Sequence, residues 1–321
     1  MYGASAEGPV NYRGNGPNVA LLTVTGDGGA PPGGYPRRMP ELVEVERYRT
    51  LAERAVGRPI ASVDSPDPWF LKGAATAEVL SGLLVGSCFT AARRIGKLLL
   101  LDVDVGDGVD VPDPYHQADG DGSDAGPVLG IRFGMTGTLL VDDDDAVGQL
   151  LYSSTRRDPA WDRFAVRFTD GGRMVVHDPR RLGGVSVDPD VSGLGPDAAS
   201  VGVAGLTGAL RGSSAPLKAR LLDQSRIAGI GNLIADEVLW RAGLSPERPA
   251  SSLSPTELRR LHRHLVATVG DLSDRGGSHL GDLMAERHPG GVCPKDGASL
   301  TRTTVGGRTT WWCPTHQVAA P

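Results

Sequence analysis

The sequence predicts an α+β fold: an N-terminal β-sandwich with flanking helices, then a helical domain, then a terminal β-hairpin. Short apolar or alternating segments typical of strands recur across residues 87–177. Helical spacing of apolar residues dominates 201–284, and the run Gly193-Leu194-Gly195-Pro196 separates the two regions. Residues 290–317 are rich in Gly, Thr and Trp, which is typical of a small hairpin.

Local patterns predict the individual elements. Leu42, Val45 and Tyr48 recur at helical spacing, so we expect a helix over 41–56, and a shorter one fits 74–84. The expected strands are Phe89–Ile95, Leu98–Val103, Val128–Phe133, Thr138–Val141, Ala165–Phe168 and Met174–His177. The expected C-terminal helices are 201–211, 216–223, 232–242, 254–271 and 278–284.

Composition limits the class of protein. A chain of 321 residues is long enough for two domains, and 40% apolar residues are enough for ordinary cores. No apolar run approaches the roughly 20 residues of a membrane helix, so we expect a soluble monomer that does not bind membranes. Three cysteines without an export signal favour the bacterial cytoplasm over a disulfide framework.

The first 38 residues contain nine Gly and five Pro and offer little to form a core. Their apolar run, Val19–Val24, is too short for a secretory signal and follows no basic stretch. Two interpretations stay open. Residues 1–38 are a disordered tail, or translation starts at Met39.

The stretch Met39-Pro40-Glu41-Leu42-Val43-Glu44 decides the chemistry. If Met39 starts the chain and is removed, Pro40 carries a free secondary amine. An N-terminal amine of pKa ~8 is about one-tenth neutral at pH 7, against about four in ten thousand for lysine, so it is the better nucleophile toward a sugar C1′. Glu41 and Glu44 would then move protons. The alternative is an ordinary Pro-Glu helix start.

Charge is unevenly distributed. The net charge is −5, but 12 Asp lie in two loops, at 102–126 and 142–145, so the remainder carries +7. Residues 206–317 hold 14 Lys/Arg against 10 Asp/Glu. A basic working surface is compatible with DNA binding. We interpret the acidic loops as solvated rather than regulatory.

Three turns carry side chains suited to DNA. Lys97 follows Gly96 at a tight turn and suits a phosphate. The loops Phe133–Gly137 and Asp178–Gly184 place glycines around Met135, Arg180 and Leu182. These side chains suit filling the space of an everted base, or else are core and surface residues.

The segment 217–237 has a helix, a turn punctuated by Gly229 and Gly231, and a second helix from Asn232. Glycines allow close approach to phosphate, and a helix N-terminus offers free N–H groups. Lys218 and Asn232 are therefore candidate backbone contacts.

The terminal hairpin pairs Cys293-x2-Asp296 with Cys313-x2-His316, a spacing that suits tetrahedral Zn²⁺. His288 is a rival fourth ligand. Arg308 lies between the two pairs and is expected to contact phosphate.

Together and in this order, these segments resemble the formamidopyrimidine-DNA glycosylase / endonuclease VIII family from Met39 to Gln317. The resemblance implies a catalytic β-sandwich at 39–190 with an acidic insertion at 102–126, a helix–two-turn–helix domain at 191–285 and a zinc-finger-like hairpin at 286–317. It also implies base-excision repair of double-stranded DNA with damaged bases or abasic sites. Glycosylase and AP-lyase steps would end in β,δ-elimination.

The resemblance further implies roles for individual residues. Pro40 would be the nucleophile, Glu41 and Glu44 the acid–base groups, and Lys97 a phosphate contact in the catalytic site. The implied void-filling residues are Met135, Arg180 and Leu182, and the implied backbone contacts are Lys218, Asn232 and Arg308. The implied structural zinc ligands are Cys293, Asp296, Cys313 and His316.

Several positions depart from the family pattern. Val43 stands where the purine-specific branch has proline, Leu182 replaces a phenylalanine, and Asp296 and His316 replace cysteines. The segment Leu283–Val292 is short where purine enzymes carry a long loop over the lesion. Oxidised purines, oxidised pyrimidines and abasic sites all stay open as substrates. A non-catalytic damaged-DNA-binding protein and a zinc-ribbon transcription or translation factor are the alternatives outside this class.

Overall fold

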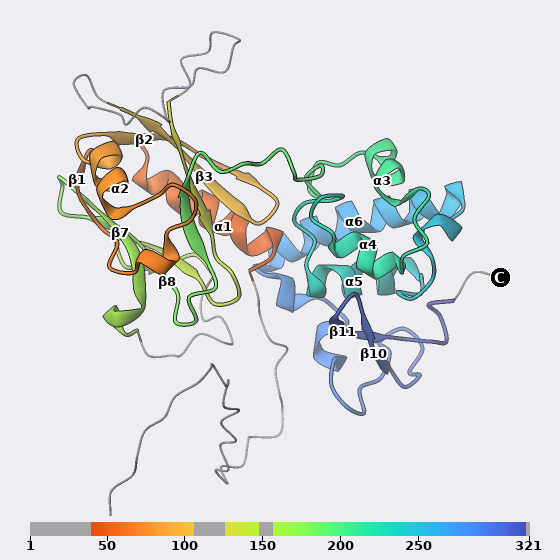
Figure 1. Ribbon diagram of the computed structural model, residues 1–321. Helices are drawn as coiled ribbons and strands as arrows, with labels where there is room; N and C mark the ends of the chain where they lie inside the picture. The colour runs from red at the N-terminus through yellow and green to blue at the C-terminus, as the bar shows by residue number, and fades with distance from the viewer. Residues whose placement is uncertain (1–39, 106–125, 148–156, 319–321) are drawn as a thin grey trace, which may run out of the picture. The chain divides into compact units, whose positions relative to one another are not determined.

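The computed structural model describes residues 40–105, 126–147 and 157–318, all within one compact unit of the chain. Within these ranges the protein combines antiparallel sheets with six α-helices, which confirms the α+β prediction (Figure 1). None of the helices described here is both long enough and apolar enough to span a bilayer.

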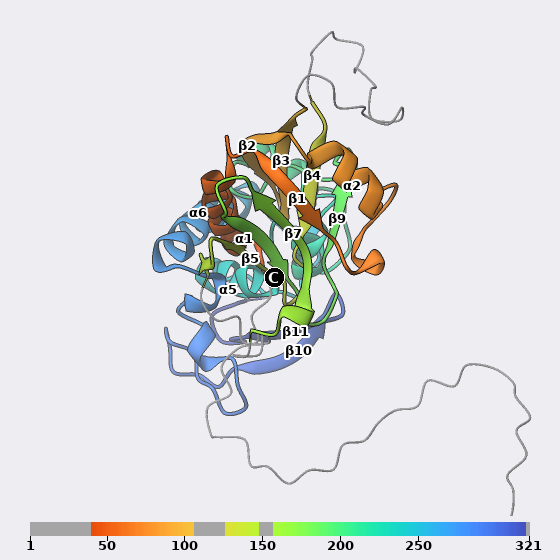
Figure 2. The same ribbon diagram turned by 90° about the vertical axis from the view of Figure 1, so that its left-hand side faces the viewer.

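Two antiparallel sheets form the N-terminal part. The five-stranded sheet has the order β1 (Ile60–Asp64), β7 (Asp162–Phe168), β8 (Arg173–His177), β5 (Thr138–Val141) and β6 (Asp144–Asp145). The four-stranded sheet has the order β2 (Cys88–Ile95), β3 (Leu98–Asp104), β4 (Val128–Arg132) and β9 (Gly184–Val187). Side chains of both sheets, such as Leu99 and Val176, share one core. The expected sandwich of two sheets is therefore present (Figure 2).

Helix α1 (Leu42–Ala52) leads into the sandwich and buries Val45, Tyr48 and Leu51 in its core. The helix was expected to reach residue 56, but it tightens into the 3-10 turn η1 (Glu53–Ala55). Helix α2 (Ala77–Leu84) is capped by Thr76 and buries Leu80, Leu83 and Leu84. Two further 3-10 turns are η2 (Pro68–Phe70) and η3 (Pro159–Trp161).

The acidic run 142–145 is largely exposed, as expected of a solvated loop, and its carboxylates also pair with arginines of neighbouring elements. Asp142 lies 2.8 Å from Arg58 and Asp144 lies 2.7 Å from Arg54. Asp143 pairs with Arg173. Two of these pairs link the β5–β6 turn to the segment after α1, and the third links it to β8. Most of the 102–126 loop lies outside the described residues.

The C-terminal helices are α3 (Val203–Leu210), α4 (Leu217–Leu222), α5 (Asn232–Ala242) and α6 (Pro255–Arg275), with a short turn η4 (Ala250–Ser252) before α6. Helix α6 starts at a Ser254 cap with Pro255 in its first turn and ends at Gly276, whose φ is 99°. Their apolar faces form a second core with Leu42 and Val43.

The helix predicted over 278–284 is wrong. Two short 3-10 turns, η5 (Ser278–Leu280) and η6 (Met284–Glu286), stand in its place. The buried Glu237 carboxylate of α5 accepts the backbone N–H groups of Asp282 and Leu283, each at 3.0 Å. Those donors are therefore withdrawn from any helical ladder.

The end of the chain is a hairpin of β10 (Thr301–Val305) and β11 (Arg308–Trp312), as expected. It turns through Gly306 and Gly307 with φ of 58° and 70°, the left-handed pair that a two-residue hairpin turn requires. A small third core beneath it includes Leu233, Trp240, Cys293 and Cys313.

Candidate active site

Glu41 precedes α1 and is held by the N-terminus of α5. Its carboxylate accepts the N–H groups of Leu233 at 2.8 Å and Ile234 at 3.1 Å. A side chain on Gly231 would lie 2.1 Å from the Glu41 carboxyl carbon, so the glycine makes room for this contact. Burial raises the pKa of Glu41, although the charge of Lys97 and the two N–H donors oppose that rise. The group is thus biased toward a protonated acid.

Glu44 lies one helical turn further on and is equally buried. One carboxylate oxygen accepts the Glu41 N–H at 2.9 Å, which caps α1. The other accepts both the N–H and the hydroxyl of Ser278 at 2.7 Å. Sequence reasoning missed Ser278. The only signal in the sequence was the Gly276-Gly277 pair before Ser278, because glycines allow two backbone segments to approach closely.

Lys97 lies at the β2–β3 turn, where Gly96 has φ of 56°. Its ammonium donates to the Ile230 carbonyl at 2.9 Å, within the glycine loop before α5. Burial lowers the pKa of Lys97 and the Arg308 cation lowers it further, while Glu41 and Glu44 act in the opposite direction. The Lys97 ammonium is therefore buried within reach of both acidic and basic charges.

Gln224, another residue that sequence reasoning missed, shapes the glycine loop. Its amide donates to the Ile230 carbonyl at 2.9 Å and its oxygen accepts the Gly229 N–H at 2.9 Å. The Ile230 carbonyl thus receives donors from both Gln224 and Lys97. This shared acceptor fixes the loop against the turn that carries Lys97.

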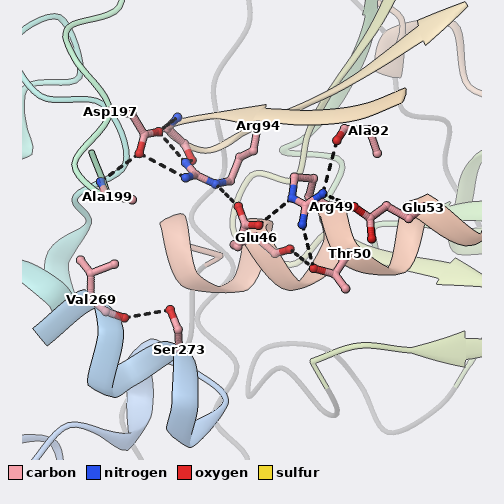
Figure 3. Close-up of polar contacts among 11 residues, drawn as sticks. Glu46, Arg49, Thr50, Glu53, Ala92, Arg94, Asp197, Ala199, Val269 and Ser273 are labelled. Carbon is pink, nitrogen blue, oxygen red and sulfur yellow. Dashed lines mark hydrogen bonds and ion pairs between the residues drawn. The ribbon is translucent and has the colours of Figure 1, made fainter. Parts of the chain in front are cut away.

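The same turn is fastened by Asp197. Figure 3 shows Arg94 between Glu46 of α1 and Asp197, at 2.8 Å and 2.5 Å. One Asp197 oxygen accepts from Arg94 and from the Gly96 N–H at 2.6 Å, and the other accepts the Ala199 N–H at 2.9 Å. Asp197 therefore holds the residue next to Lys97.

Pro40 is buried at the head of α1, next to Glu41. In the 321-residue chain it follows Met39, so its nitrogen is an amide without a lone pair for attack. The predicted nucleophile thus lies beside both predicted acid–base groups. It becomes an amine only if the Met39–Pro40 bond is cut.

The two glycine-flanked loops lie against each other. Asp178 joins them, because its carboxylate accepts the Thr136 hydroxyl at 2.5 Å and the Gly183 N–H at 2.8 Å. A side chain on Gly134 would lie 2.4 Å from the Leu182 carbonyl carbon. Arg180 is exposed, Leu182 is 49% exposed and Met135 is half-buried. All three predicted void-filling residues come from this pair of loops.

The predicted DNA-backbone contacts of Asn232 and Arg308 stay predictions, whereas the structure buries Lys218 completely. Arg308 is exposed beside the hairpin turn, and the buried Asn232 Oδ1 has no hydrogen-bond donor among the residues that the structure describes. Lys218 is fully buried, with its ammonium 2.7 Å from Asp236 and 2.8 Å from the Thr310 hydroxyl. The prediction that Lys218 faces a phosphate is wrong for this structure, because the charge is already neutralised inside the protein.

Cys293, Asp296, Cys313 and His316 bring four ligand atoms within 4.8 Å of one another. The His316 Nδ1 is 3.4 Å from the Cys293 sulfur and 3.3 Å from an Asp296 oxygen. The other ring nitrogen of His316 lies 3.0 Å from the Trp240 carbonyl, which directs Nδ1 toward the cluster. His288, the rival ligand, is exposed and lies outside this group.

Comparisons with known proteins agree with this arrangement. Residues 39–185 match the formamidopyrimidine-DNA glycosylase N-terminal domain, and residues 193–280 match the formamidopyrimidine-DNA glycosylase H2TH domain. A formamidopyrimidine-DNA glycosylase (Fpg) of Thermus thermophilus is 33% identical, over 88% of this chain and 100% of that protein.

Solved structures share the fold. The crystal structure of the Thermus thermophilus Fpg protein has a TM-score of 0.66 at 29% identity, over 88% of this chain and 100% of that one. A complex between Lactococcus lactis Fpg and DNA containing an abasic site has a TM-score of 0.67 at 23% identity, over 87% and 99%. The chain therefore belongs to the formamidopyrimidine-DNA glycosylase family.

Proposed function

We propose that this protein is a base-excision-repair DNA glycosylase with AP-lyase activity. It would act on double-stranded DNA that contains damaged bases or abasic sites. The observation that carries the proposal is the juxtaposition of Pro40 with Glu41 and Glu44, both buried and each held by a segment from the far end of the chain.

The chemistry starts from the Pro40 amine of a chain that begins at Met39 and has lost that Met. The amine attacks C1′ of the damaged nucleotide and the bond from C1′ to the base breaks. The base leaves with the bonding electron pair and takes up the proton that the Pro40 nitrogen loses. Glu41, whose pKa burial raises, supplies a proton to the sugar ring oxygen as the ring opens. The product is an iminium between Pro40 and C1′.

The iminium withdraws electrons, so the C2′ proton leaves to a base and the 3′-phosphate is expelled. A second elimination expels the 5′-phosphate, and water releases the sugar fragment from Pro40. Glu44, whose carboxylate accepts the backbone N–H of Glu41 at 2.9 Å, would be the second acid–base group and would hold a proton or a water near the reacting sugar. Lys97 and Arg308 would hold the phosphates beside the reacting sugar.

The proposed contacts with the disrupted base pair are made by side chains that are exposed or half-buried. Arg180, Leu182 and Met135 would enter the space left by the everted nucleotide, with Arg180 donating to the estranged base. Asn232 and Arg308 would contact phosphates, and the Asn232 Oδ1, which has no donor among the described residues, would accept from a water.

The four-residue cluster suits Zn²⁺. Bond lengths of roughly 2.0–2.3 Å in a tetrahedron separate ligand atoms by about 3.3–3.8 Å. Cys293–His316, Cys313–Asp296 and His316–Asp296 approach to 3.3–3.4 Å, and all four ligand atoms lie within 4.8 Å of one another. The ion would be structural and would hold the hairpin that carries Arg308.

Borohydride trapping tests the proposal. Protein starting at Met39 should form a covalent complex with abasic DNA through Pro40, and Pro40→Gly should weaken it severely. The full 321-residue chain should trap nothing. Normal trapping by the full chain would show that another amine attacks, and Lys97 is the first to test because its pKa is lowered. A purely DNA-binding role would give affinity for lesion duplexes without trapping by either form.

A further inference from the structure

Trp69 is the most exposed of the large apolar side chains in the described ranges, at 68%. It lies in the turn η2, between Pro68 and the fully buried Phe70. Phe70 anchors the turn in the sandwich core, and the indole projects from it. Because the indole buries little of its apolar surface, it contributes little to the stability of the fold.

The turn is tied to the loop that carries Arg180 and Leu182. One oxygen of the buried Asp67 accepts both the Trp69 N–H at 3.2 Å and an Arg181 N–H at 2.6 Å. The other oxygen accepts from Arg181 at 2.6 Å. Arg181 has φ of 56°, an uncommon conformation for a side chain of its size, and this bidentate pair holds it there.

The other end of the turn is tied to the same loop. Lys72 donates its N–H to the Val185 carbonyl at 2.8 Å, and Leu71 bridges to Val185. The turn that carries Trp69 is therefore fastened to the chain before and after Leu182, at Arg181 and Val185.

The surroundings of the indole are cationic. The Lys72 ammonium lies 5.1 Å from the centre of the ring and 2.6 Å from the Trp69 carbonyl. Arg180 precedes Arg181 on the loop that Asp67 holds, and Arg132 lies on β4, which pairs with β9; both are exposed, as is Lys72. The neighbouring acid Asp67 is buried and paired with Arg181. An aromatic face bordered by cations matches a nucleotide strand, with its flat bases and anionic phosphates.

We propose that Trp69 and Lys72 form a second DNA contact, which binds the strand opposite the lesion. The proposal rests on the proposed function, in which Leu182 and Arg180 occupy the disrupted base pair. Leu182 offers no π face, so the indole supplies the stacking surface for an unpaired base of that strand. Lys72 contacts a phosphate of the same strand.

Binding by the full 321-residue chain tests the contact without turnover. The probe is a duplex with a tetrahydrofuran abasic analogue, read by fluorescence anisotropy. Trp69→Ala should weaken binding by about five- to 150-fold, the range that one stacked base contributes. Trp69→Phe should retain most of the affinity. Val318→Ala, which truncates a side chain that is 55% exposed at the other end of the chain, should change nothing.

Two readouts identify the strand. A 2-aminopurine opposite the abasic analogue should change fluorescence on binding, and Trp69→Ala should reduce that change. The same probe in the lesion strand should respond alike to both proteins. Lys72→Gln should flatten the dependence of log affinity on log salt by about one unit.

Unchanged affinity and unchanged 2-aminopurine signal in Trp69→Ala would overturn the contact and leave a protein partner as the occupant of the patch. Loss confined to the lesion-strand probe would overturn the assignment of the strand. If wild-type protein shows no preference for the abasic duplex, the proposed function itself fails. A wild-type preference that Trp69→Ala keeps intact rejects only this contact.

Discussion

We expect substitution of Asp197 to disturb the turn that carries Lys97. Its carboxylate accepts from Arg94 twice, from Gly96 and from Ala199. The Arg94 and Asp197 side chains are only 8% and 15% exposed. Asp197→Ala would therefore leave a mostly buried guanidinium with one partner fewer and two backbone N–H groups without an acceptor.

Removing one member of a buried ion pair costs about 3–5 kcal/mol. Arg94 keeps Glu46 at 2.8 Å and the Gly96 carbonyl at 2.9 Å, so we expect the lower end, about 3 kcal/mol. Asp197→Asn keeps an oxygen for one of the N–H groups and should cost less, about 1–2 kcal/mol.

Urea unfolding measures the loss, with binding to an abasic duplex as the second readout because Lys97 should lose its fixed position. Asp190→Ala is the matched control, since within the described ranges the Asp190 carboxylate bonds to Ser192 of its own exposed turn. A double variant that also carries Arg94→Met should recover part of the stability. A loss below about 1 kcal/mol with unchanged DNA binding would refute this account of Asp197.

Three further predictions follow from the site. Arg308→Ala should lower affinity equally on all sequences and flatten the salt dependence by about one unit, whereas Arg302→Ala on the same hairpin should not. A raised pKa of Glu41 means that the folded state binds its proton more tightly, so stability should fall as pH rises above about 4.5, and Glu41→Gln should make that decline shallower in urea titrations. Chelation should lower the melting temperature and DNA affinity of the wild type but not of Cys313→Ala, and equal responses would exclude a stabilising ion.

The sequence predicted best what depends on neighbours along the chain. The β2–β3 hairpin and α1 were placed to within a few residues because periodicity and turn glycines are local signals. Strands β1 and β9 were missed. Strand β9 has only four residues, Gly184–Val187, and is defined by pairing with β4 across 50 residues of chain. Such pairing leaves little trace in its own composition.

The same contrast between local signals and long-range packing applies to the candidate site. Pro40, Glu41, Glu44 and Lys97 were predicted together from motifs, and the structure brings the last three into electrostatic contact. Lys218 was misassigned because a lysine on a short helix is normally exposed, and its partner Asp236 lies a helix away. The burial of Lys218 depends on the packing of α4, α5 and β11, so the residues next to it in the sequence do not predict it.

The environment of the two acids in the candidate site also depends on contacts between residues far apart in the sequence. The Glu41 carboxylate is held by Leu233 and Ile234, and the Glu44 carboxylate by Ser278, all of them roughly 190 residues or more further along the chain. Helix α1 alone therefore cannot set the environment of either acid. If the C-terminal helices separated from α1, Glu41 would regain water and its pKa would return toward the ordinary value. The acid that the proposed mechanism needs is thus a property of the docked C-terminal helices as much as of the sequence motif that contains it.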